Sequence, residues 1–467
     1  MLYREHVINL LDTPGHRDFS EDTYRVLTAV DSALMVIDAA NGVEAQTKRL
    51  IEVCRQRDTP IMTFVNKMDR EGRDPIELLD EIEAELGMPC VPMTWPVGQG
   101  KAFGGIINLR TQTMRVFQPG EDTVEASAAE EIPLSDTATL KARFGADFDH
   151  AMANIELLSG VSPAFDREAF LAARQTPVFF GSAVNNFGVQ EVLDALVDLA
   201  PPPHPRASSN ADGSLTEIAP DSEGFSGVVF KVQANMDPQH RDRIAFVRVC
   251  SGKYASGMKL KVVRSGKEMR PTSVVTFLSQ RREAVDEAYA GDIIGFTIHG
   301  GVQLGDTITD GASLQFTGLP FFAPELFQTV ELKNPLKSKQ LQQGLAQLGE
   351  EGAIQVFKPQ LGSLMLLGAV GQLQFEVVQH RLSTEYKAEI ALKGSQFVGA
   401  RWVTCDDPAE MKKFMDYNAA KLAYDAADTL AYLLTSNYDL RLTQERHPKI
   451  QFHPLREHAG LKLEQAA

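Results

Sequence analysis

The chain has 467 residues, of which 43% are hydrophobic and 23% are charged, close to the averages of folded globular proteins. This composition excludes wholesale disorder, and the net charge of −16 argues against a general nucleic-acid coat protein. The apolar runs fall far short of the roughly 20 residues that span a bilayer, and the four cysteines stand far apart without a CxxC pair. We therefore expect a cytoplasmic protein of about three domains, with reduced thiols and no membrane association.

Short apolar runs alternate with helical patterns over residues 1–205. The runs lie at 6–12, 33–39, 60–65 and 177–180, and each one stops at a polar or glycine-rich residue. Such runs are typical of buried parallel strands. Strands that alternate with helices predict a doubly wound α/β sheet, whose ligands bind outside the carboxyl ends of the strands.

The segments between the predicted strands of this first domain include a helix and an insertion. The helical pattern over 20–31 places Tyr24, Leu27 and Val30 on one face. The stretch between Asn66 and Ser182 is too long for a single crossover connection. Residues 104–118 alternate like a hairpin, and residues 121–170 are acidic and helical in composition. We therefore expect an inserted subdomain at about residues 100–175.

The rest of the chain changes its pattern twice. A breaker-rich linker at 206–223 is followed by short alternating runs between glycine turns over 224–312, which predict an antiparallel β-barrel. Residues 320–467 mix helical and strand patterns and predict an α+β sandwich. The expected fold is multidomain: an α/β domain, a β-barrel and an α+β sandwich.

Three short motifs follow three of the predicted strands, and the first is Asp12-Thr13-Pro14-Gly15-His16. A carboxylate at a strand end can hold Mg²⁺ through water, and a glycine amide beyond it can sense a terminal phosphate. A histidine there can orient an attacking water. Taken alone, the same residues could form an ordinary turn at the end of a strand.

The second motif is Asn66-Lys67-Met68-Asp69, at the end of the third predicted strand. An aspartate at the tip of a buried strand can accept hydrogen bonds from the ring N–H and the exocyclic amine of guanine. Adenine lacks those donors and would leave a buried carboxylate unpaired, so it is rejected. A chance match in a polar loop is the alternative for a motif of this length.

The third motif, Gly181-Ser182-Ala183, could present a backbone amide to the carbonyl oxygen of guanine. It is weak alone. Together, however, the three motifs follow three strands in the order that a guanine-nucleotide site requires. The sequence therefore predicts GTP or GDP as the ligand, with Mg²⁺ as its metal.

These motifs resemble those of translational GTPases, and the similarity extends well beyond them. DTPGHRDFSEDTYRVLTAVD, VFKVQANMDPQHRDRIAFVRVCSGKY and GAVGQLQFEVVQHRLSTEY resemble the peptide chain release factor 3 family, and the likeness covers residues 6–458. It implies a P-loop-GTPase-like domain, a translation-factor β-barrel and a third α/β domain. It also implies a monomeric, ribosome-dependent GTPase of the cytoplasm that stimulates and recycles class I release factors in translation termination, without a DNA partner.

The resemblance also implies a role for each matched residue. Asp12 would lie near the magnesium ion, Gly15 would sense the phosphate and His16 would position the hydrolytic water as the catalytic residue. The expected nucleotide-binding residues as a set are Asp12, Thr13, Pro14, Gly15, His16, Asn66, Lys67, Met68, Asp69, Ser182 and Ala183.

No GxxxxGK[ST] motif occurs in the 467 residues. Family members carry this phosphate-binding loop upstream of the segment that matches 6–12, together with a switch loop whose threonine binds Mg²⁺. We expect either a sequence that starts inside a longer protein or gene, or a shortened paralogue that binds the ribosome without nucleotide. In both cases the G domain would be truncated at its N-terminus, the phosphates would lose their main charge partners, and two strand edges would be left unpaired.

Two other classes share parts of this pattern. Elongation factor G and the ribosomal protection proteins carry the same motifs and barrel, but they continue into two further domains. A non-enzymatic ribosome-binding module is a different class, and residues 225–310 hold 12 Lys or Arg against 9 Asp or Glu. Lys231, Arg241, Arg243 and Arg248 could there contact ribosomal RNA phosphates, unless the barrel surface is simply solvated.

Overall fold

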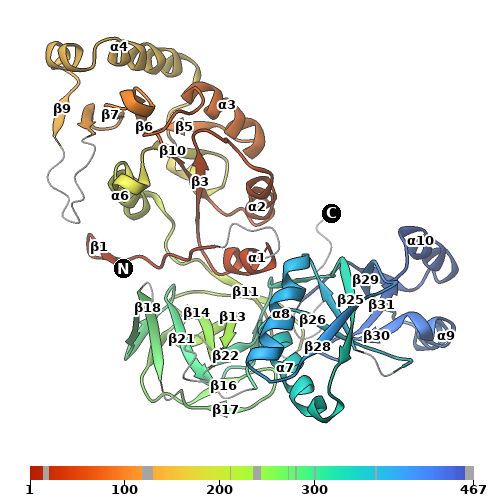
Figure 1. The fold of residues 1–467 in the computed structure, drawn as a ribbon. Helices are drawn as coiled ribbons and strands as arrows, with labels where there is room; N and C mark the ends of the chain where they lie inside the picture. The colour runs from red at the N-terminus through yellow and green to blue at the C-terminus, as the bar shows by residue number, and fades with distance from the viewer. Residues whose placement is uncertain are drawn as a thin grey trace. The chain divides into compact units, whose positions relative to one another are not determined.

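The computed structural model has the secondary structure drawn in Figure 1. It describes residues 1–13, 20–117, 130–210, 212–234, 243–271, 273–278, 281–298, 301–362 and 365–457. The chain forms two compact units: unit 1 comprises Met1–Ile8 and Val30–Pro202, and unit 2 comprises Asn9–Ala29 and Pro203–Ala467. Within the described ranges, no helix is both long enough and apolar enough to cross a membrane.

Unit 1 is built on a parallel four-stranded sheet in the order β3-β4-β10-β5. Its strands are β3 (Ala33–Asp38), β4 (Ile61–Asn66), β10 (Thr176–Phe180) and β5 (Cys90–Pro92). The two central strands are apolar and buried almost throughout, as expected for a sheet covered on both faces. The predicted strands at 33–39, 60–65 and 177–180 are therefore confirmed.

The helices of unit 1 are α2 (Ala45–Gln56), α3 (Pro75–Leu86) and α6 (Val189–Leu199). The sequence sets both ends of α3. Asp74 accepts hydrogen bonds from the backbone N–H groups of Ile76 and Glu77, and Gly87 ends the helix in the left-handed conformation. Buried side chains of α6 pack beside Phe64 and Phe179 of the sheet.

A second sheet in unit 1 has three of its four strands in the stretch where the sequence predicted an insertion, and its first strand precedes that stretch. It is antiparallel, and its strands are β6 (Thr94–Val97), β7 (Gly105–Asn108), β8 (Thr113–Val116) and β9 (Glu131–Pro133). The helix α4 (Thr137–Val161) packs against β6, and α5 (Arg167–Leu171) follows it.

The predicted parallel strand at residues 6–12 is wrong. The structure has a short antiparallel hairpin of β1 (Leu2–Tyr3) and β2 (His6–Val7), and residues 8–13 form no strand. The physical reason lies at the edge of the sheet. Among the described residues β3 pairs only with β4, so the run does not extend the sheet at the open edge of β3 and packs in unit 2 instead.

Residues 9–11 instead pack within unit 2. The Asn9 amide donates a hydrogen bond to Asp292 Oδ1 at 3.1 Å, and Leu11 packs against a cluster that contains Phe230 and Leu319. The helix α1 (Ser20–Thr28) contributes Val26 to the same cluster. The segment that follows the hairpin therefore belongs to unit 2.

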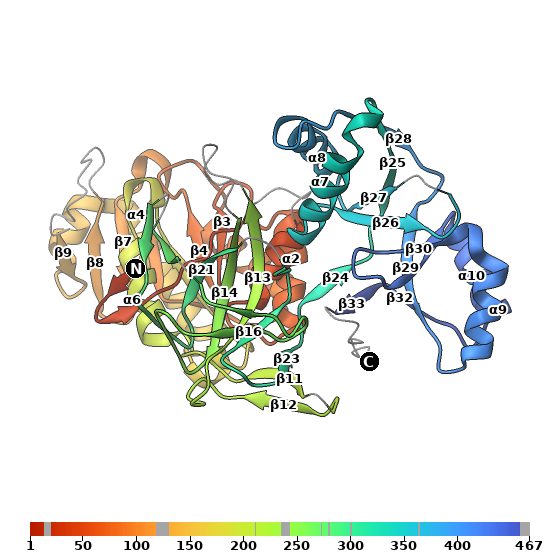
Figure 2. The same ribbon diagram turned by 90° about the horizontal axis from the view of Figure 1, so that it is seen from below.

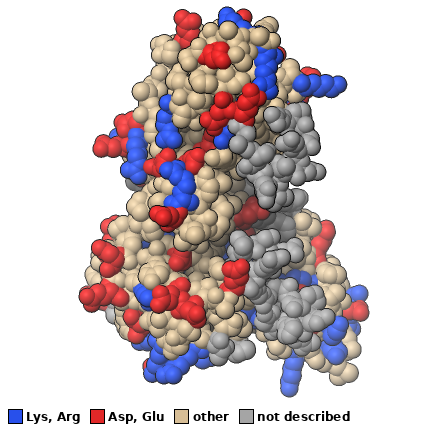
Figure 3. Space-filling view, turned by 90° about the vertical axis from the view of Figure 1, so that its left-hand side faces the viewer, with Lys and Arg blue, Asp and Glu red and all other residues tan. Residues whose placement is uncertain are grey.

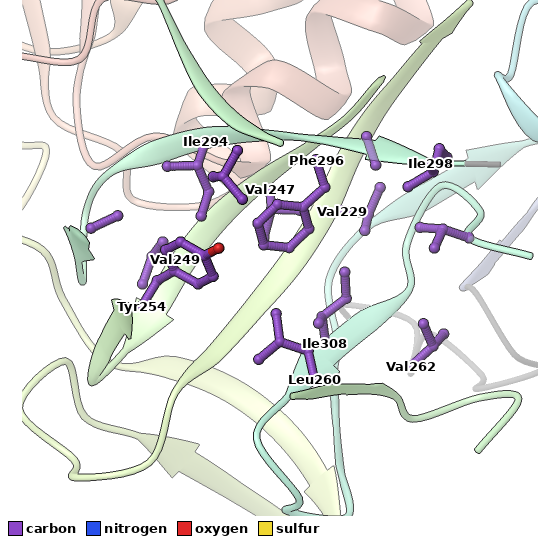
Figure 4. Packing of buried hydrophobic residues seen from close by; sticks show 14 of the residues in the cluster. Val229, Val247, Val249, Tyr254, Leu260, Val262, Ile294, Phe296, Ile298 and Ile308 are labelled. Carbon is purple, nitrogen blue, oxygen red and sulfur yellow. The ribbon is translucent and has the colours of Figure 1, made fainter. Parts of the chain in front are cut away.

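The barrel of unit 2 is an antiparallel eight-stranded sheet in the order β17-β16-β22-β13-β14-β21-β18-β19. Its strands are β13 (Ser226–Ala234), β14 (Arg243–Ser251), β16 (Leu260–Val262), β17 (Glu268–Met269), β18 (Val274–Leu278), β19 (Arg281–Ala284), β21 (Ile293–Ile298) and β22 (Thr307–Thr309). Alternate side chains point inward, and Figure 4 shows Val229, Val247, Ile294 and Phe296 among those that fill its core. The period of two thus separates the side chains that fill this core from those of the other face, of which Phe230 and Ile293 pack in a second cluster.

Short strands flank the barrel in sequence. β11 (Arg206–Asn210) lies between β12 (Leu215–Ile218) and β23 (Leu314–Phe316) in a three-stranded sheet. The sequence predicted a linker at 206–223, because this stretch holds few apolar residues. Its strands form nevertheless, since pairing with β23 satisfies the backbone of the buried Ser208 and Ser209.

The last part of unit 2 is a mixed helix and sheet structure with two halves (Figure 2). In the first, α7 (Ser338–Glu350) and α8 (Gln372–Thr384) pack on β25 (Leu326–Leu332), β26 (Gln355–Pro359), β27 (Leu366–Ala369) and β28 (Ile390–Gly394). The second holds α9 (Pro408–Asn418), α10 (Asn437–Arg446), β29 (Gly399–Thr404), β30 (Leu422–Tyr424), β31 (Leu430–Leu434) and β32 (Gln451–His453). Between the barrel and these halves runs β24 (Pro320–Phe322), which pairs with β33 (Leu455–Glu457).

Candidate functional site

Two of the predicted motifs meet at the carboxyl edge of the unit 1 sheet. β4 and β10 are parallel neighbours with Val65 opposite Phe180, so the loops that follow them start side by side. The side-chain oxygen of Asn66 accepts hydrogen bonds from the backbone N–H of Lys67 and of Ala183, both at 2.8 Å. Asn66 thus ties the second motif to the third.

A second link joins the same loops through Asp69. The buried Ser182 hydroxyl donates a hydrogen bond to Asp69 Oδ1 at 2.5 Å, and the Asn185 amide donates to that hydroxyl at 2.7 Å. The Asp69 carboxylate is half-buried and held at one oxygen. Its second oxygen is therefore oriented by the fold before any ligand arrives.

The backbone of the second motif is also fixed. Lys67 has a φ of 68°, in the left-handed region, and turns the chain away from β4. Met68 is fully buried, and its N–H donates to the carbonyl oxygen of Gly181 at 3.1 Å. Met68 therefore fixes the loop to the interior of unit 1, whereas Lys67 is exposed and Asp69 is half-buried.

Gly181 has little room for a side chain. A Cβ on this residue would lie 2.3 Å from the carbonyl oxygen of Phe187 and 2.9 Å from the ring of Phe64. Ser182 and Phe187 form a bridge just beyond it, which folds the third motif back over the end of β10. Glycine is thus required here by a close approach of two backbone segments.

Lys67 is paired with a residue that the sequence motifs did not include. Its ammonium lies 2.6 Å from Asp38 Oδ2, and Asp38 ends the neighbouring strand β3. This ammonium, together with the backbone N–H of Ala40, holds the pKa of the Asp38 carboxyl below its usual range. The signal was present in the sequence, because Asp38 stands at the carboxyl end of a predicted strand, as Asn66 does.

The first motif is described only in part. Asp12 is exposed and Thr13 is half-buried, and both belong to unit 2, whereas the second and third motifs belong to unit 1. Pro14, Gly15 and His16 lie outside the described residues. In the described part of the chain, no three His, Cys, Asp or Glu side chains gather as a cluster able to hold a metal ion.

Two of the four basic barrel residues singled out in the sequence are buried and cannot contact RNA phosphates. Arg243 is 7% exposed and pairs with Glu350 at 2.7 Å, and Arg248 is 5% exposed and donates to the carbonyl oxygen of Gly291. Lys231 lies 3.2 Å from Asp22. The interpretation of Arg243 and Arg248 as phosphate contacts is wrong, because both are buried against other parts of unit 2.

Arg241 lies outside the described residues. On the face shown in Figure 3, acidic and basic side chains both occur among neutral ones. The charge count of the barrel sequence therefore did not predict that Arg243 and Arg248 are buried.

Three family models match successive parts of the chain. The Elongation factor Tu GTP binding domain matches residues 1–202, and Elongation factor G domain 2 matches 224–311. The model described as Class II release factor RF3, C-terminal domain, matches 316–444. The first match contains the two loops that meet at the edge of the sheet.

Curated relatives are similar over nearly the whole chain. A peptide chain release factor 3 of Bordetella pertussis is 63% identical over 461 residues, which are 98% of this chain and 85% of that protein. A protein of the same name from Nitrosomonas eutropha is 61% identical and covers 100% of this chain and 86% of its own.

A solved structure supports the fold. A crystal structure of a protein from Thermus thermophilus matches with a TM-score of 0.65 at 22% sequence identity, over 87% of this chain. The chain spans 62% of the length of that protein, so this likeness concerns the fold alone. The identity to curated relatives carries the assignment: the chain belongs to the peptide chain release factor 3 family.

Proposed function

We propose that this chain is a GTP-binding translation termination factor that holds the guanine base at the loops after β4 and β10. As a ribosome-dependent GTPase of the cytoplasm, it would stimulate and recycle class I release factors. The relatives' name and the match to a GTP-binding domain support the reaction class. The geometry of Asp69 and Ser182 is the observation that carries the base site.

The base site supplies the hydrogen-bond chemistry that guanine needs. Asp69 is held at one oxygen by Ser182, and its carboxylate can accept from the N1–H and the exocyclic amine of guanine. In this structure the Ala183 N–H is donated to Asn66. We therefore assign base selection to Asp69, and to Asn66 and Ser182 the task of holding the two loops in place.

The metal and phosphate contacts are assigned to the first motif. The exposed carboxylate of Asp12 is open to a hydrated Mg²⁺ ion, which binds through oxygen ligands and keeps several of its waters. We propose that Gly15 contacts the phosphate and that His16 orients the attacking water. When bound, the ion would neutralise charge on the phosphates.

A base-specificity switch tests this assignment. Fluorescent GDP is titrated into the chain in the presence of Mg²⁺, and the titration is repeated with Asp69→Asn and with xanthosine diphosphate as competitor. Asp69→Asn removes the charge from the hydrogen bonds between Asp69 and guanine, so GDP binding should weaken by about 10- to 100-fold. The new amide should favour xanthine, because xanthine presents a carbonyl where guanine has an amine.

Asp58→Asn is the matched control, since Asp58 is an exposed carboxylate of unit 1 outside these loops. It should leave both affinities unchanged. Absence of GDP binding by the unmodified chain would contradict the proposed nucleotide binding, and equal effects of the two substitutions would contradict the base site. If GTP bound but no phosphate were released on ribosomes, the result would support the base site and contradict the GTPase reaction.

A further inference from the structure

Unit 2 contains a cavity of about 410 Å³ that no step of the proposed function uses. α7 and β26 form one wall, and a barrel loop, β24 and β33 contribute the others. Pockets that bind small molecules in other proteins have volumes of about 300–1,000 Å³. This cavity is therefore large enough for a small organic ligand.

The wall of this cavity is mainly apolar. Leu304, Leu345 and Val356 are buried side chains that line it, and Met365 and Phe321 are half-buried there. Water beside these five side chains finds few hydrogen-bond partners. An alkyl chain or a ring that displaces this water would gain contacts with all of these side chains.

The charged side chains on the wall of the cavity differ in whether their charge is already paired within the protein. Glu350 already accepts a hydrogen bond from Arg243 at 2.7 Å, so its charge is compensated within the protein. Lys358 also lines the cavity, and it is exposed at the end of β26. A ligand that enters therefore meets a compensated carboxylate and an accessible ammonium.

A second cation on the wall is fixed in place. The Arg456 guanidinium lies 4.6 Å from the ring centroid of Phe321 and 5.3 Å from that of Trp402. Its Nε lies 2.8 Å from Asp425, which also accepts a hydrogen bond from the indole N–H of Trp402. These contacts hold a positively charged, planar group against the apolar part of the cavity.

We propose that this cavity binds a small amphipathic carboxylate. Its apolar body would lie against Leu345, Val356 and Met365, and its carboxylate would face Lys358. The inference is independent of the guanine site, because every residue that lines the cavity belongs to unit 2.

Octanoate is the probe for this proposal, and octanol, which has the same chain length without the charge, is its counterpart. Isothermal titration of the full chain should show one saturable octanoate site and weaker binding of octanol. Ala346→Trp should abolish binding, because Ala346 lines the cavity and is exposed, so a large side chain there can fill the space without entering the core.

Charge-reversal variants distinguish octanoate binding in the cavity from non-specific attraction of octanoate to a positive charge elsewhere on the surface. Lys358→Glu should weaken octanoate binding by about tenfold or more while octanol binding stays the same. Lys339→Glu on the exposed side of α7 is the matched control, because Lys339 does not line the cavity. Its affinity should equal that of the unmodified chain.

Three outcomes would overturn the proposal. The first is no saturable binding at millimolar octanoate. The second is equal binding by the chain and by Ala346→Trp, which would place the ligand elsewhere. The third is equal affinity for octanoate and octanol, or equal effects of the two lysine substitutions, which would remove the carboxylate from the assignment.

Discussion

At the scale of single residues, the candidate base site is defined by hydrogen bonds between two loops. The motifs after β4 and β10 were visible in the sequence, but their pairing was not. Asn66 accepts from Ala183, and Ser182 donates to Asp69, across more than 100 residues of chain. Periodicity predicts that both loops lie at one edge of a sheet, whereas only the folded chain shows which polar atoms meet.

Ser182→Ala tests whether this pairing prepares the site. The substitution removes the donor to Asp69 Oδ1, so the carboxylate is no longer held in one orientation. GDP affinity should fall by about 3- to 10-fold, in line with the loss of one hydrogen bond of about 1 kcal/mol. Fluorescent-GDP titration measures this change.

Ser159→Ala on the exposed surface of α4 is the control for the Ser182 substitution. Its hydroxyl donates only to the local carbonyl oxygen of Glu156 at 2.7 Å, so GDP affinity should not change. If both serine variants bound GDP like the unmodified chain, Ser182 would have no part in positioning Asp69.

The pair of Lys67 and Asp38 gives a pH-dependent prediction. Lys67 lowers the pKa of Asp38 below 3.8, its ordinary value, so this pair stabilises the folded chain above that pH. The contribution is lost as the pH falls through the lowered pKa, because the protonated carboxyl no longer attracts the ammonium. Lys67→Met should therefore raise the pKa of Asp38 toward 3.8.

A carboxyl titration followed by NMR measures this pKa directly. Lys101→Met serves as control, since Lys101 is an exposed lysine of the same unit. The expected change in stability at neutral pH is below about 1 kcal/mol, because both side chains are partly exposed. An unchanged Asp38 pKa in Lys67→Met would mean that the backbone contact alone lowers it.

At the scale of elements, α1 forms as its sequence pattern predicted but differs from that pattern in the side chains that it buries. The pattern over 20–31 predicted a helix with Tyr24, Leu27 and Val30 on one face. The helix is present, but its most buried side chains include Arg25 and Glu21, at 2% and 5% exposure. Hydrophobic spacing cannot predict that this ion pair within the helix is buried, because the other partners of its two side chains come from distant parts of the chain.

Those partners lie in the loop before β26 and within it. Arg25 Nη2 donates to Glu21 at 3.0 Å, and Arg25 Nη1 lies 3.4 Å from the carbonyl oxygen of Gly352. Gln355 donates to the other Glu21 oxygen at 3.3 Å. Gly352 has a φ of 72°, and a Cβ there would lie 2.4 Å from Arg25 Nη1, so a glycine lets the loop approach the guanidinium.

Removing one member of this pair should be costly. Arg25→Ala leaves the Glu21 carboxylate buried without its ion-pair partner and should destabilise unit 2 by about 3–5 kcal/mol. The double change Glu21→Gln with Arg25→Met should restore most of that loss, because no uncompensated charge remains. Urea unfolding followed by Trp402 fluorescence in a Trp95→Phe background reports on unit 2, since the chain has two tryptophans.

Arg270→Ala is the control for a lost arginine, because Arg270 is exposed in the barrel. Its effect should be within about 0.5 kcal/mol of zero. If Arg25→Ala were as mild, the ion pair would contribute little, and the packing of Val26 and Ala29 would account for the position of α1.

At the scale of the whole molecule, the sequence predicted the succession of folds better than the assignment of segments to them. The α/β, barrel and α+β parts follow from local periods of 3.6 and 2, which the chain carries in every stretch. The place of Asn9–Ala29 in unit 2 does not follow from any local pattern. It depends on which edges and surfaces are present elsewhere, as the packing of Leu11 near Phe230 illustrates.

The division into two units leads to a prediction about nucleotide binding. The loops that hold Asp69 and Ser182 belong to unit 1, and a ligand that binds only the folded unit stabilises it by RT ln(1 + [L]/Kd). At a GDP concentration about 100 times Kd this amounts to about 2.7 kcal/mol. Each unit contains one tryptophan, Trp95 in unit 1 and Trp402 in unit 2, and both are buried.

Thermal unfolding of Trp402→Phe and Trp95→Phe variants should therefore respond differently to GDP. The transition reported by Trp95 should move to higher temperature, and that reported by Trp402 should move less, because the loops that hold the base belong to unit 1 and unit 2 supplies only the first motif. Nucleotide-free buffer and adenosine diphosphate, which the Asp69 carboxylate should reject, provide the controls. An equal shift of both transitions would show that nucleotide binding is coupled to the folding of both units, and no shift of either would argue against nucleotide binding by this chain.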